Sequence, residues 1–376
     1  MRFASLFTGI GGFELGLAAS GFEPALLCEI DPIARAVLRA RFPAVEICTD
    51  VTELEQLPAG TDLVTAGFPC QDLSSSGPKG GIEGLRSGLI GEVFRLVENS
   101  RPRWVLLENV HFMLHLSKGA AIAQIAANFE ALGYSWAYRV LDSQGFGLPQ
   151  RRRRVFILAS LDGDPRDVLL TDQGSFEATA PSLDKPIGFY WTEGTYATGL
   201  AGDAVPPLKG GSTIGIPSPP AILLPDGLVG MPHVEDAEAL QGFPRGWSVA
   251  AESVAKASYR WKLIGNAVPV NVALWVGSKL SRPGSYHASN DLPLDTKATW
   301  PDAAWGAGGE RYRAQVGHYP RDVRSPSLAA LLQHELRPLS VRAASGFLSR
   351  ARKGRLRFPA GFLESVERHL HLAAAR

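Results

Sequence analysis

Three stretches of the sequence carry the side chains best suited to covalent chemistry. Cys70 follows an apolar run at 63–66, which predicts a thiol just past the carboxyl end of a buried strand. Glu108 follows a fully apolar run at 104–107, and four consecutive arginines, 151–154, lead into another. A thiolate is a nucleophile, a carboxyl group carries a proton and a guanidinium binds an oxygen atom. These residue types together indicate nucleophilic catalysis.

Each of these stretches also has a purely structural explanation. Cys70 could be a small buried hydrophobe, as most free cysteines are. The arginine run could be a solvated basic surface. On a strand, however, Arg152 and Arg154 share one face, where they need anions or carbonyl groups as partners. Glu108 directly follows an apolar run, and burying a carboxylate without a partner is costly, so we do not expect Glu108 to be an ordinary core residue.

A strand, a glycine turn and a helix at the amino terminus predict a cofactor site of the nucleotide type. Residues 2–7 have the pattern of a strand and 13–19 the apolar spacing of a helix. The turn between them consists of Thr8, Gly9, Ile10, Gly11 and Gly12. Glycines there let a ligand approach the N–H groups at the helix start. Because the turn lacks the dinucleotide fingerprint, neither NAD nor a Rossmann dehydrogenase is favoured.

Polar residues end the next two expected strands as well. Glu29 follows the second strand, where a carboxylate suits a ribose diol, whereas Asp31 precedes Pro32 and is the expected helix N-cap. Asp50, after the third strand, could accept a hydrogen bond from an exocyclic amine or cap a loop. Phe7 could stack on an adenine ring or belong to the core. Each structural alternative is reasonable alone, but the carboxyl ends of parallel strands converge on one crevice.

The ordered set of motifs resembles the DNA (cytosine-5)-methyltransferases, of the bacterial or phage type. The resemblance covers residues 1 to about 280, and the order makes it specific, since any one motif could occur by chance. The motifs are Phe7-Thr8-Gly9-Ile10-Gly11-Gly12, Glu29, Asp50, Gly67-Phe68-Pro69-Cys70-Gln71, Glu108-Asn109-Val110, Gln150-x-Arg152-x-Arg154, Leu240-Gln241-Gly242-Phe243-Pro244 and the stretch 260–270.

The resemblance implies catalytic roles for four residues. The Cys70 thiolate would add to carbon 6 of a cytosine, which makes carbon 5 nucleophilic. Glu108 would protonate or hydrogen-bond ring N3, and Arg154 would bind the base O2, with Arg152 supporting it or a loop. The methyl group would come from S-adenosyl-L-methionine, leaving S-adenosyl-L-homocysteine. Because carbon 5 is inaccessible inside a duplex, the base must be flipped out.

The resemblance also implies binding residues for the cofactor and for double-stranded DNA. The expected cofactor residues are Phe7, Thr8, Gly9, Gly11, Gly12, Glu29, Ile30, Asp50, Val51, Pro69, Asn266 and Ala267. The expected DNA-binding residues are Gln71, Ser74, Ser75, Arg86 and Gln150, with the glycine-rich loop 74–88 closing over the DNA. The three cysteines have no metal-like spacing, so we expect no metal.

The expected fold is α/β: a Rossmann-like S-adenosylmethionine-dependent methyltransferase sheet with a small, irregular, β-rich target-recognition domain and a C-terminal helical appendage. The predicted boundaries are 1–160 plus 258–284 for the catalytic domain, 161–257 for target recognition and 285–376 for the extension. The stretch 209–213 could contact phosphates or be a plain glycine turn. Residues 281–376 hold 15 Lys and Arg against 8 Asp and Glu, so the extension either contacts DNA phosphates or is a packing lid.

Composition narrows the cellular setting. A hydrophobic content of 45% and a charged content of 20% are ordinary for a globular protein, and neither a membrane-spanning run nor a signal-peptide pattern is present. We therefore expect a cytoplasmic monomer acting on DNA, with a cognate restriction endonuclease as a possible partner. Two alternatives stay open: a methyltransferase acting on tRNA, as in one eukaryotic branch of the family, and a catalytically dead DNA-binding or regulatory member.

Overall fold

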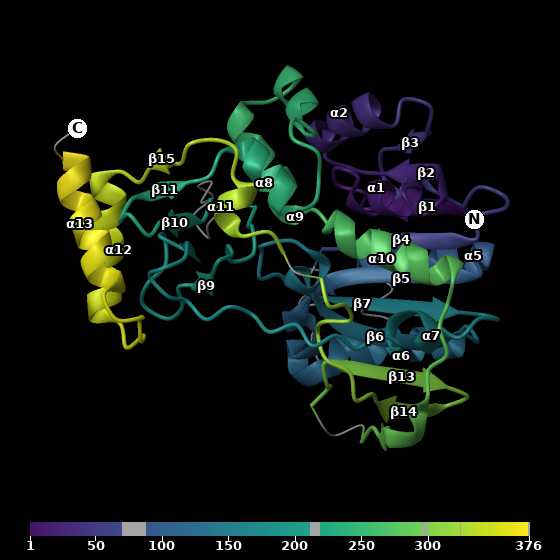
Figure 1. Ribbon diagram of the computed structural model, residues 1–376. Coiled ribbons are helices and arrows are strands. Elements are labelled where there is room, and N and C mark those ends of the chain that lie inside the picture. Colours follow the sequence, from purple (N-terminus) through teal and green to yellow (C-terminus); the bar gives the residue numbers. More distant parts are fainter. Residues whose placement is uncertain (70–87, 211–218, 296–298, 324, 375–376) are drawn as a thin grey trace. The chain divides into compact units, whose positions relative to one another are not determined.

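A computed structural model describes residues 1–69, 88–210, 219–295, 299–323 and 325–374 (Figure 1). The chain divides into two compact units. Unit 1 contains Met1–Gly145, Arg153–Ser175 and Val268–Asp322, and unit 2 contains Phe146–Arg152, Phe176–Ala267 and Val323–Arg376. Among the described residues, no helix has the length and apolar character needed to cross a membrane.

Unit 1 is built on a mixed sheet with the strand order β12-β14-β13-β6-β7-β5-β4-β1-β2-β3. Strands β3, β2, β1, β4 and β5 are parallel, and the strands from β7 to β12 pair antiparallel. The strands are β1 (Arg2–Leu6), β2 (Glu23–Cys28), β3 (Ile47–Cys48), β4 (Leu63–Gly67), β5 (Trp104–Val110), β6 (Ser135–Asp142), β7 (Arg153–Ser160), β12 (Leu292–Pro293), β13 (Ala303–Ala307) and β14 (Glu310–Arg313).

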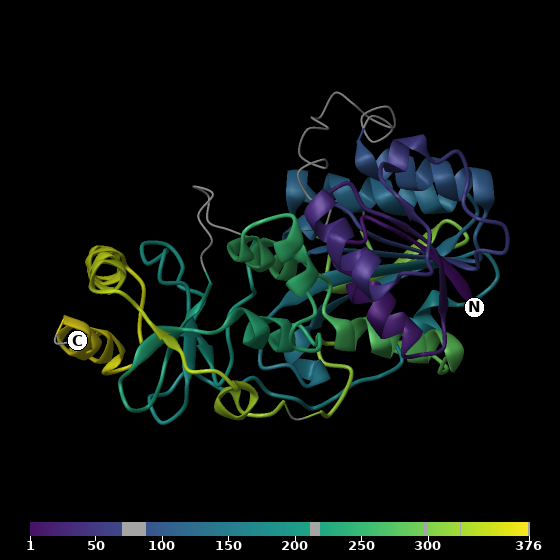
Figure 2. The ribbon, with the colours of Figure 1, turned by 90° about the horizontal axis from the view of Figure 1, so that it is seen from above.

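Helices cover both faces of this sheet (Figure 2). On β7, Val155 and Ile157 face the apolar cluster that contains α5 and α6, whereas Phe156 on the opposite face meets Phe13 of α1. The helices of unit 1 are α1 (Gly12–Ala18), α2 (Pro32–Arg41), α5 (Leu89–Ser100), α6 (Ala120–Ala131), α7 (Pro165–Leu169) and α10 (Val270–Ser281), with short 3₁₀ turns η1 (Val51–Glu53), η2 (His111–Leu114), η3 (Leu116–Gly119), η4 (Ser143–Phe146) and η7 (Ala288–Asn290).

Helix α1 packs very closely against α10 and the residues just before it. A Cβ atom on Gly12 would come within 2.3 Å of the Val268 carbonyl oxygen. A Cβ atom on Gly16 would lie 2.6 Å from both the Val270 carbonyl oxygen and the Ala273 Cβ. Glycine is therefore required at both positions, and the return of the chain at 268–281 closes the unit beside its first helix.

Unit 2 contains a small antiparallel sheet with the order β15-β11-β10-β8-β9. Its hydrophobic core is shared with the last two helices, since Phe189 of β8 lies against Phe347 of α12 and Phe362 of α13. The elements are β8 (Ile187–Phe189), β9 (Ala201–Gly202), β10 (Ala221–Leu223), β11 (Val229–Met231), β15 (Arg337–Pro338), α8 (Val234–Leu240), η5 (Val249–Ser253), η6 (Ala257–Tyr259), α9 (Arg260–Asn266), α11 (Leu328–Leu331), α12 (Val341–Lys353) and α13 (Phe362–Ala374).

The predicted α/β class and the C-terminal helical region are confirmed, but residues 285–376 are arranged differently from the predicted single appendage. Residues 285–322 lie in unit 1, where β13 pairs with β6 and forms a hairpin with β14. Residues 323–376 lie in unit 2. Helix α11 is a single turn that ends at Leu331.

Candidate active site

The carboxyl ends of the parallel strands bring the predicted chemistry to one edge of the unit 1 sheet. Strands β1, β2, β4 and β5 run in the same direction, so the residues that follow them lie along the same edge. Strand β7 runs the opposite way, and its first residues therefore lie beside the end of β5, with Arg154 paired to Val110. This register brings the arginine motif, far along the chain, back to Glu108.

Glu108 and Arg154 form an ion pair at this edge. The Arg154 Nε atom lies 3.2 Å from Glu108 Oε1, and the two side chains are 15% and 9% exposed. Glu108 also pairs in register with Gly67. Because Gly67 has no side chain, the Glu108 carboxylate lies in the space beside it, within van der Waals distance of where a Cβ atom would be. The carboxylate thus lies beside the end of β4, which leads directly to Cys70. A partly buried acid and a guanidinium at one point suit binding of a polar ring.

Asn109 connects the end of β5 to the chain after β4. Its side-chain amide donates to the Phe68 carbonyl at 3.0 Å, and its Oδ1 accepts from the Val110 N–H at 2.8 Å. Asn109 is buried, so this contact fixes the backbone just before Pro69. The predicted residues Cys70, Gln71, Ser74, Ser75 and Arg86 lie outside the described residues, as does most of the glycine-rich loop.

The glycine turn after β1 is held to the end of β2. The Thr8 backbone N–H donates to the Cys28 carbonyl at 3.1 Å, and the Thr8 hydroxyl accepts from the Cys28 N–H at 3.2 Å. Gly11, the residue before α1, has φ +92°, and a Cβ there would lie 2.7 Å from the Phe42 ring. Glycine is therefore required at this position. Gly9 also has a positive φ and open space around its Cα, which leaves its surface accessible.

Glu29 is held rigidly at the end of β2. Its Oε2 accepts from the Gly9 N–H at 2.7 Å, and its Oε1 accepts from the Asp31 N–H at 2.8 Å. Burial raises the pKa of Glu29, against the opposing effect of those two hydrogen bonds. The next residue, Ile30, is 68% exposed, which is unusual for isoleucine at a buried strand end and suits contact with a ligand. Asp31 caps α2, as its position before Pro32 predicted.

The other predicted cofactor residues of unit 1 are used in different ways. Phe7 is half-buried and has φ +55°, a strained angle for an aromatic residue at the strand end. Asp50 caps η1 by accepting from the Thr52 N–H and hydroxyl, which lower its pKa. Val51 is buried in the core and Pro69 is exposed. The structure thus shows a capping role for Asp50, the alternative that its sequence position left open.

Two residues of the arginine motif, Gln150 and Arg152, belong to unit 2, and their side chains are buried and hydrogen-bonded there. The Arg152 guanidinium is buried and donates to the carbonyls of Leu208, Gly265 and Ala267 at 3.0, 3.1 and 3.0 Å. Gln150 has no exposed surface, and its amide donates to the Leu240 carbonyl and to Gln241. A direct DNA contact by Gln150 does not fit this position. A buried arginine requires hydrogen-bond acceptors, and for Arg152 these are backbone carbonyl groups of the protein itself.

The remaining predicted cofactor residues, Asn266 and Ala267, end helix α9 in unit 2, with Asn266 exposed and Ala267 buried. Sequence reasoning missed Asn109 as a positioning residue, although it stands between two residues of a motif. It also missed Glu14, which is fully buried in α1 and has no hydrogen-bond partner among the described residues. A charged residue inside the apolar stripe of an expected helix was the available signal.

Comparison with known proteins shows the family. Residues 1–188 match the model of the C-5 cytosine-specific DNA methylases. Over 386 aligned positions the chain is 46% identical to the Type II methyltransferase M2.BsuMI of Bacillus subtilis (strain 168), and the match covers 98% of each chain. The chain belongs to the C-5 cytosine-specific DNA methylase family. It is a DNA (cytosine-5)-methyltransferase, as the motifs predicted.

Other relatives of this DNA methylase resemble a smaller part of it. The Type II methyltransferase M.BanI of Aneurinibacillus aneurinilyticus is 36% identical over 184 residues, covering 47% of this chain and 42% of that protein. The solved structures of Schizosaccharomyces pombe Dnmt2 and of Entamoeba histolytica EhMeth each have a TM-score of 0.54, with 16% and 13% identity. They cover 74% and 75% of this chain and 98% of their own. At such low identity they show the shared fold alone.

Proposed function

We propose that this DNA (cytosine-5)-methyltransferase transfers a methyl group from S-adenosylmethionine to carbon 5 of a flipped-out cytosine in a specific double-stranded DNA sequence, through a covalent bond to Cys70. The observation that carries the proposal is the Glu108–Arg154 pair beside the end of β4. An acid, a guanidinium and the chain that leads to a thiol converge there, three groups that this reaction needs.

The first step is addition of the Cys70 thiolate to carbon 6 of the cytosine. A carbon–sulfur bond forms, and the electron pair of the 5,6 double bond is delocalised towards N3. The Glu108 carboxyl group donates a proton or a hydrogen bond at N3, which stabilises this charge. Arg154 holds the base O2 with its N–H groups, and Glu108 Oε1, which lies 3.2 Å from Arg154 Nε, orients the guanidinium while the other carboxyl oxygen carries the proton.

The second step restores the ring. Bound S-adenosylmethionine would supply the methyl group to the electron pair at carbon 5 and leave as S-adenosylhomocysteine, and a proton taken up at N3 would return to Glu108. Carbon 5 then loses its proton to water, the 5,6 double bond re-forms, and the Cys70 thiolate leaves. Asn109 serves as a positioning residue in both steps, because its bond to the Phe68 carbonyl fixes the backbone just before Cys70.

The edge of unit 1 formed by β1 and β2 fits an adenosine-type cofactor. Gly9, with open space around its Cα, leaves room for a ligand beside the glycine turn, the exposed Ile30 offers an apolar surface, and Glu29 is a fixed carboxylate at a strand end. We assign cofactor binding to this set, with Phe7, Thr8, Gly12 and Pro69 of the same unit. Asp50 and Val51 support the adjoining turn from the capping and core positions described above.

We also propose a setting for the enzyme. Gln71, Ser74, Ser75 and Arg86 contact the DNA around the flipped base, and Gln150 and Arg152 hold unit 2 together rather than touching DNA or base. The recognised sequence is read by residues within 161–257. The enzyme acts as a monomer on chromosomal DNA in the cytoplasm, in Type II restriction–modification with a cognate endonuclease, because the relative that matches its full length is a Type II methyltransferase.

The proposal is tested in two stages. Bisulfite sequencing of DNA from cells that express the protein identifies the modified site, and mass spectrometry of the nucleosides identifies 5-methylcytosine. A duplex with 5-fluorocytosine at that site should then form a covalent protein–DNA complex with S-adenosylmethionine, because fluorine cannot leave as the proton does. The Cys70→Ala variant should form no complex yet still bind cofactor and DNA. Methylation by Cys70→Ala at the wild-type rate would disprove the covalent step.

A further inference from the structure

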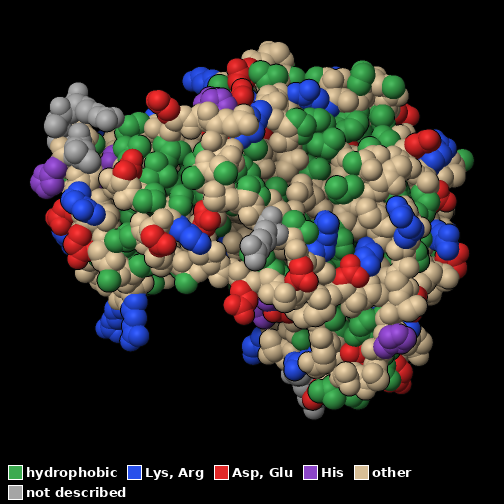
Figure 3. All heavy atoms as spheres, in the orientation of Figure 1, with side chains coloured by type: hydrophobic (Ala, Val, Ile, Leu, Met, Phe, Trp, Pro, Cys, Tyr) green, Lys and Arg blue, Asp and Glu red, His purple; other side chains and the backbone are tan. Residues whose placement is uncertain are grey.

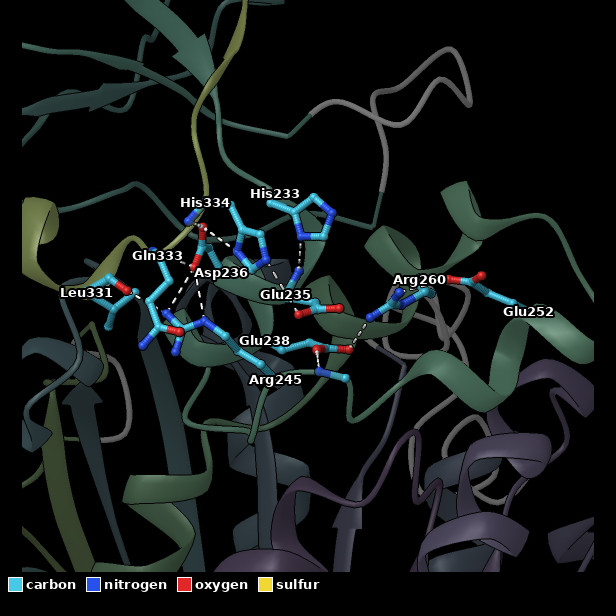
Figure 4. A network of polar contacts seen from close by, with 11 residues as sticks. His233, Glu235, Asp236, Glu238, Arg245, Glu252, Arg260, Leu331, Gln333 and His334 are labelled. Atoms are coloured by element: carbon cyan, nitrogen blue, oxygen red, sulfur yellow. Dashed lines mark hydrogen bonds and ion pairs between the residues drawn. The ribbon is translucent and has the colours of Figure 1, made fainter.

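A cluster of potential metal ligands lies at the start of α8 in unit 2 (Figure 4). His233 caps α8, Glu235 belongs to its first turn, and His334 lies on the segment between α11 and β15. One donor atom from each of the three residues lies within 4.8 Å of the other two. In Figure 4 the two imidazole rings lie side by side above the Glu235 carboxylate. Residues far apart in the sequence therefore present two nitrogens and one oxygen to one point.

The His334 ring is held from behind by a buried carboxylate. Its Nδ1 lies 3.3 Å from Asp236 Oδ2, and Asp236 is fully buried. Arg245 donates to Asp236 at 2.9 and 3.1 Å, and the backbone N–H groups of Gln333 and His334 donate to the same carboxylate. A histidine whose Nδ1–H points at an anchored carboxylate presents its Nε2 lone pair outward. This is the arrangement that commonly supports a metal-binding histidine.

The donor distances suit a small ion. His334 Nε2 and Glu235 Oε2 are 3.7 Å apart, so an ion ~2.1 Å from each fits between them without movement. His233 is exposed and its Nδ1 accepts only a long hydrogen bond, 3.3 Å, from the Glu235 N–H. That bond is easily exchanged for a metal, and the exposed ring is free to rotate closer. The stacked rings, with centroids 4.2 Å apart, bring both imidazoles to the same side.

We propose that His233, Glu235 and His334 bind one Zn²⁺ ion, with water completing the coordination. Two imidazoles and one carboxylate are a ligand set that zinc takes and that Mg²⁺ and Ca²⁺, which prefer oxygen, do not. The ion fastens the segment before β15 to the start of α8. Its role is therefore to stabilise the fold of unit 2, and it takes no part in methyl transfer.

Zinc binding is measured directly on the tag-free, full-length protein after treatment with EDTA and desalting. Titration of ZnCl₂ against a chromophoric chelator at pH ~7.5 should show one site per chain that His334→Ala, Glu235→Gln and His233→Asn each weaken at least about ten-fold. Asparagine at 233 keeps the helix cap while removing the imidazole, so its effect is not one of lost capping. His287→Asn, which removes a histidine of unit 1, should leave the affinity unchanged.

Two further readouts separate this site from the cysteines. Co²⁺ bound in place of zinc should show only weak visible bands, whereas thiolate ligands would add an intense charge-transfer absorption. Zinc should also raise the unfolding midpoint of the wild type and not that of His334→Ala. Equal zinc affinity in the wild type and His233→Asn would overturn the proposal, and so would a thiolate spectrum. These outcomes are independent of methyl transfer and leave the proposed function untouched.

Discussion

The edge of the unit 1 sheet and the C-terminal stretch 282–376 use their residues in opposite ways. At the edge, the side chains to which we assign the chemistry stand at strand ends, and single specific contacts fix this edge, such as Asn109 with Phe68 or Glu29 with Gly9. The C-terminal stretch has no catalytic motif, but it adds strands to both sheets. A region without sequence motifs can therefore still be an integral part of the fold.

The contacts of the C-terminal stretch are those of a core. Trp300 packs against Trp136 and Tyr138 of β6, beside the pairing of β13 with β6. Asp302 contacts His111, which directly follows the Glu108 motif, and His318, at 2.8 and 2.6 Å. In unit 2, α12 and α13 supply much of the apolar surface that covers β8 and β10. Deleting residues after 285 would therefore remove core from both units, and could not isolate a role in DNA binding.

The largest expected effect is on the sheet edge. Glu108→Gln should lower the rate of methyl transfer by about 10²- to 10⁴-fold, because an amide cannot donate the proton at N3 and no longer anchors Arg154. The unfolding midpoint and S-adenosylmethionine affinity should stay near those of the wild type. The assay follows transfer of a labelled methyl group to the mapped duplex. A variant that unfolds, rather than one that folds and turns over slowly, would show that this edge is structural like the C-terminal stretch.

In the C-terminal stretch we expect a substitution to lower stability. Phe347→Ala should destabilise the protein by about 3–5 kcal/mol, since this fully buried ring touches both Phe189 and Phe362 and its removal leaves a cavity. Urea unfolding followed by circular dichroism gives the free energy. Val341→Ala, an exposed residue on the same helix, is the control and should cost little. A destabilisation below about 1 kcal/mol would mean that α12 is a lid on unit 2 and not part of its core.

The contrast also marks what the sequence could and could not predict. Glu108 and Glu29 stood out because their types are unusual at the ends of apolar strands, and parallel topology places both strand ends at one edge, where the antiparallel β7 adds Arg154. The place of residues 292–313 was not found, because strand pairing with β6 joins segments far apart in the chain and short strands carry a weak pattern. Arg152 shows a third case: its residue type predicted a buried partner, but only the fold identifies three backbone carbonyls.

Glu14 tests whether the region behind the sheet edge is optimised for stability. Burial raises its pKa to about 7 from 4.5, so the folded protein holds a proton that the unfolded chain has released. Stability is thus unaffected below pH 4.5, falls as the pH rises from 4.5 to about 7, and stays lowered above that value. Glu14→Gln should be more stable than the wild type by about 2–3 kcal/mol at pH ~8 and by much less at pH ~5.

Urea unfolding at the two pH values measures the Glu14 effect, with the exposed Glu23→Gln as control. A difference between Glu14→Gln and wild type that does not change with pH would mean that Glu14 is ionised and paired in the folded protein. Helix α1, which follows the glycine turn, would then have its buried charge paired and be as stable as the helices of the C-terminal core.

Arg152 and Arg154 belong to the same motif, but we expect one to serve stability and the other activity. Arg152→Met should cost about 2 kcal/mol of stability, because three buried carbonyls lose their donor. Arg154→Met should cost less stability but most of the methyl-transfer activity, because its guanidinium holds the base. Urea unfolding and methyl transfer, measured on both variants, give the two quantities. Should both variants lose activity in proportion to stability, Arg154 would have no separate role in binding the base.

The smallest expected effect concerns the basic run at the end of α12. Arg350 donates to the carbonyls of Trp191 and Glu193, and Arg352 pairs with Glu367, so these two cations serve packing. Lys353, Arg355 and Arg357 are exposed and available to phosphates. On the face shown in Figure 3, basic and acidic side chains are interspersed rather than gathered into one broad basic patch.

Changing Lys353, Arg355 and Arg357 together to glutamine should reduce the slope of DNA affinity against salt concentration, by about one unit for each DNA phosphate that these side chains neutralise. The matched control changes three exposed arginines of unit 1, Arg39, Arg282 and Arg313, to glutamine, and so removes the same charge. An equal slope in both variants would mean that the run is a solvated surface. The C-terminal stretch would then contribute packing alone, and the division of labour with the sheet edge would be complete.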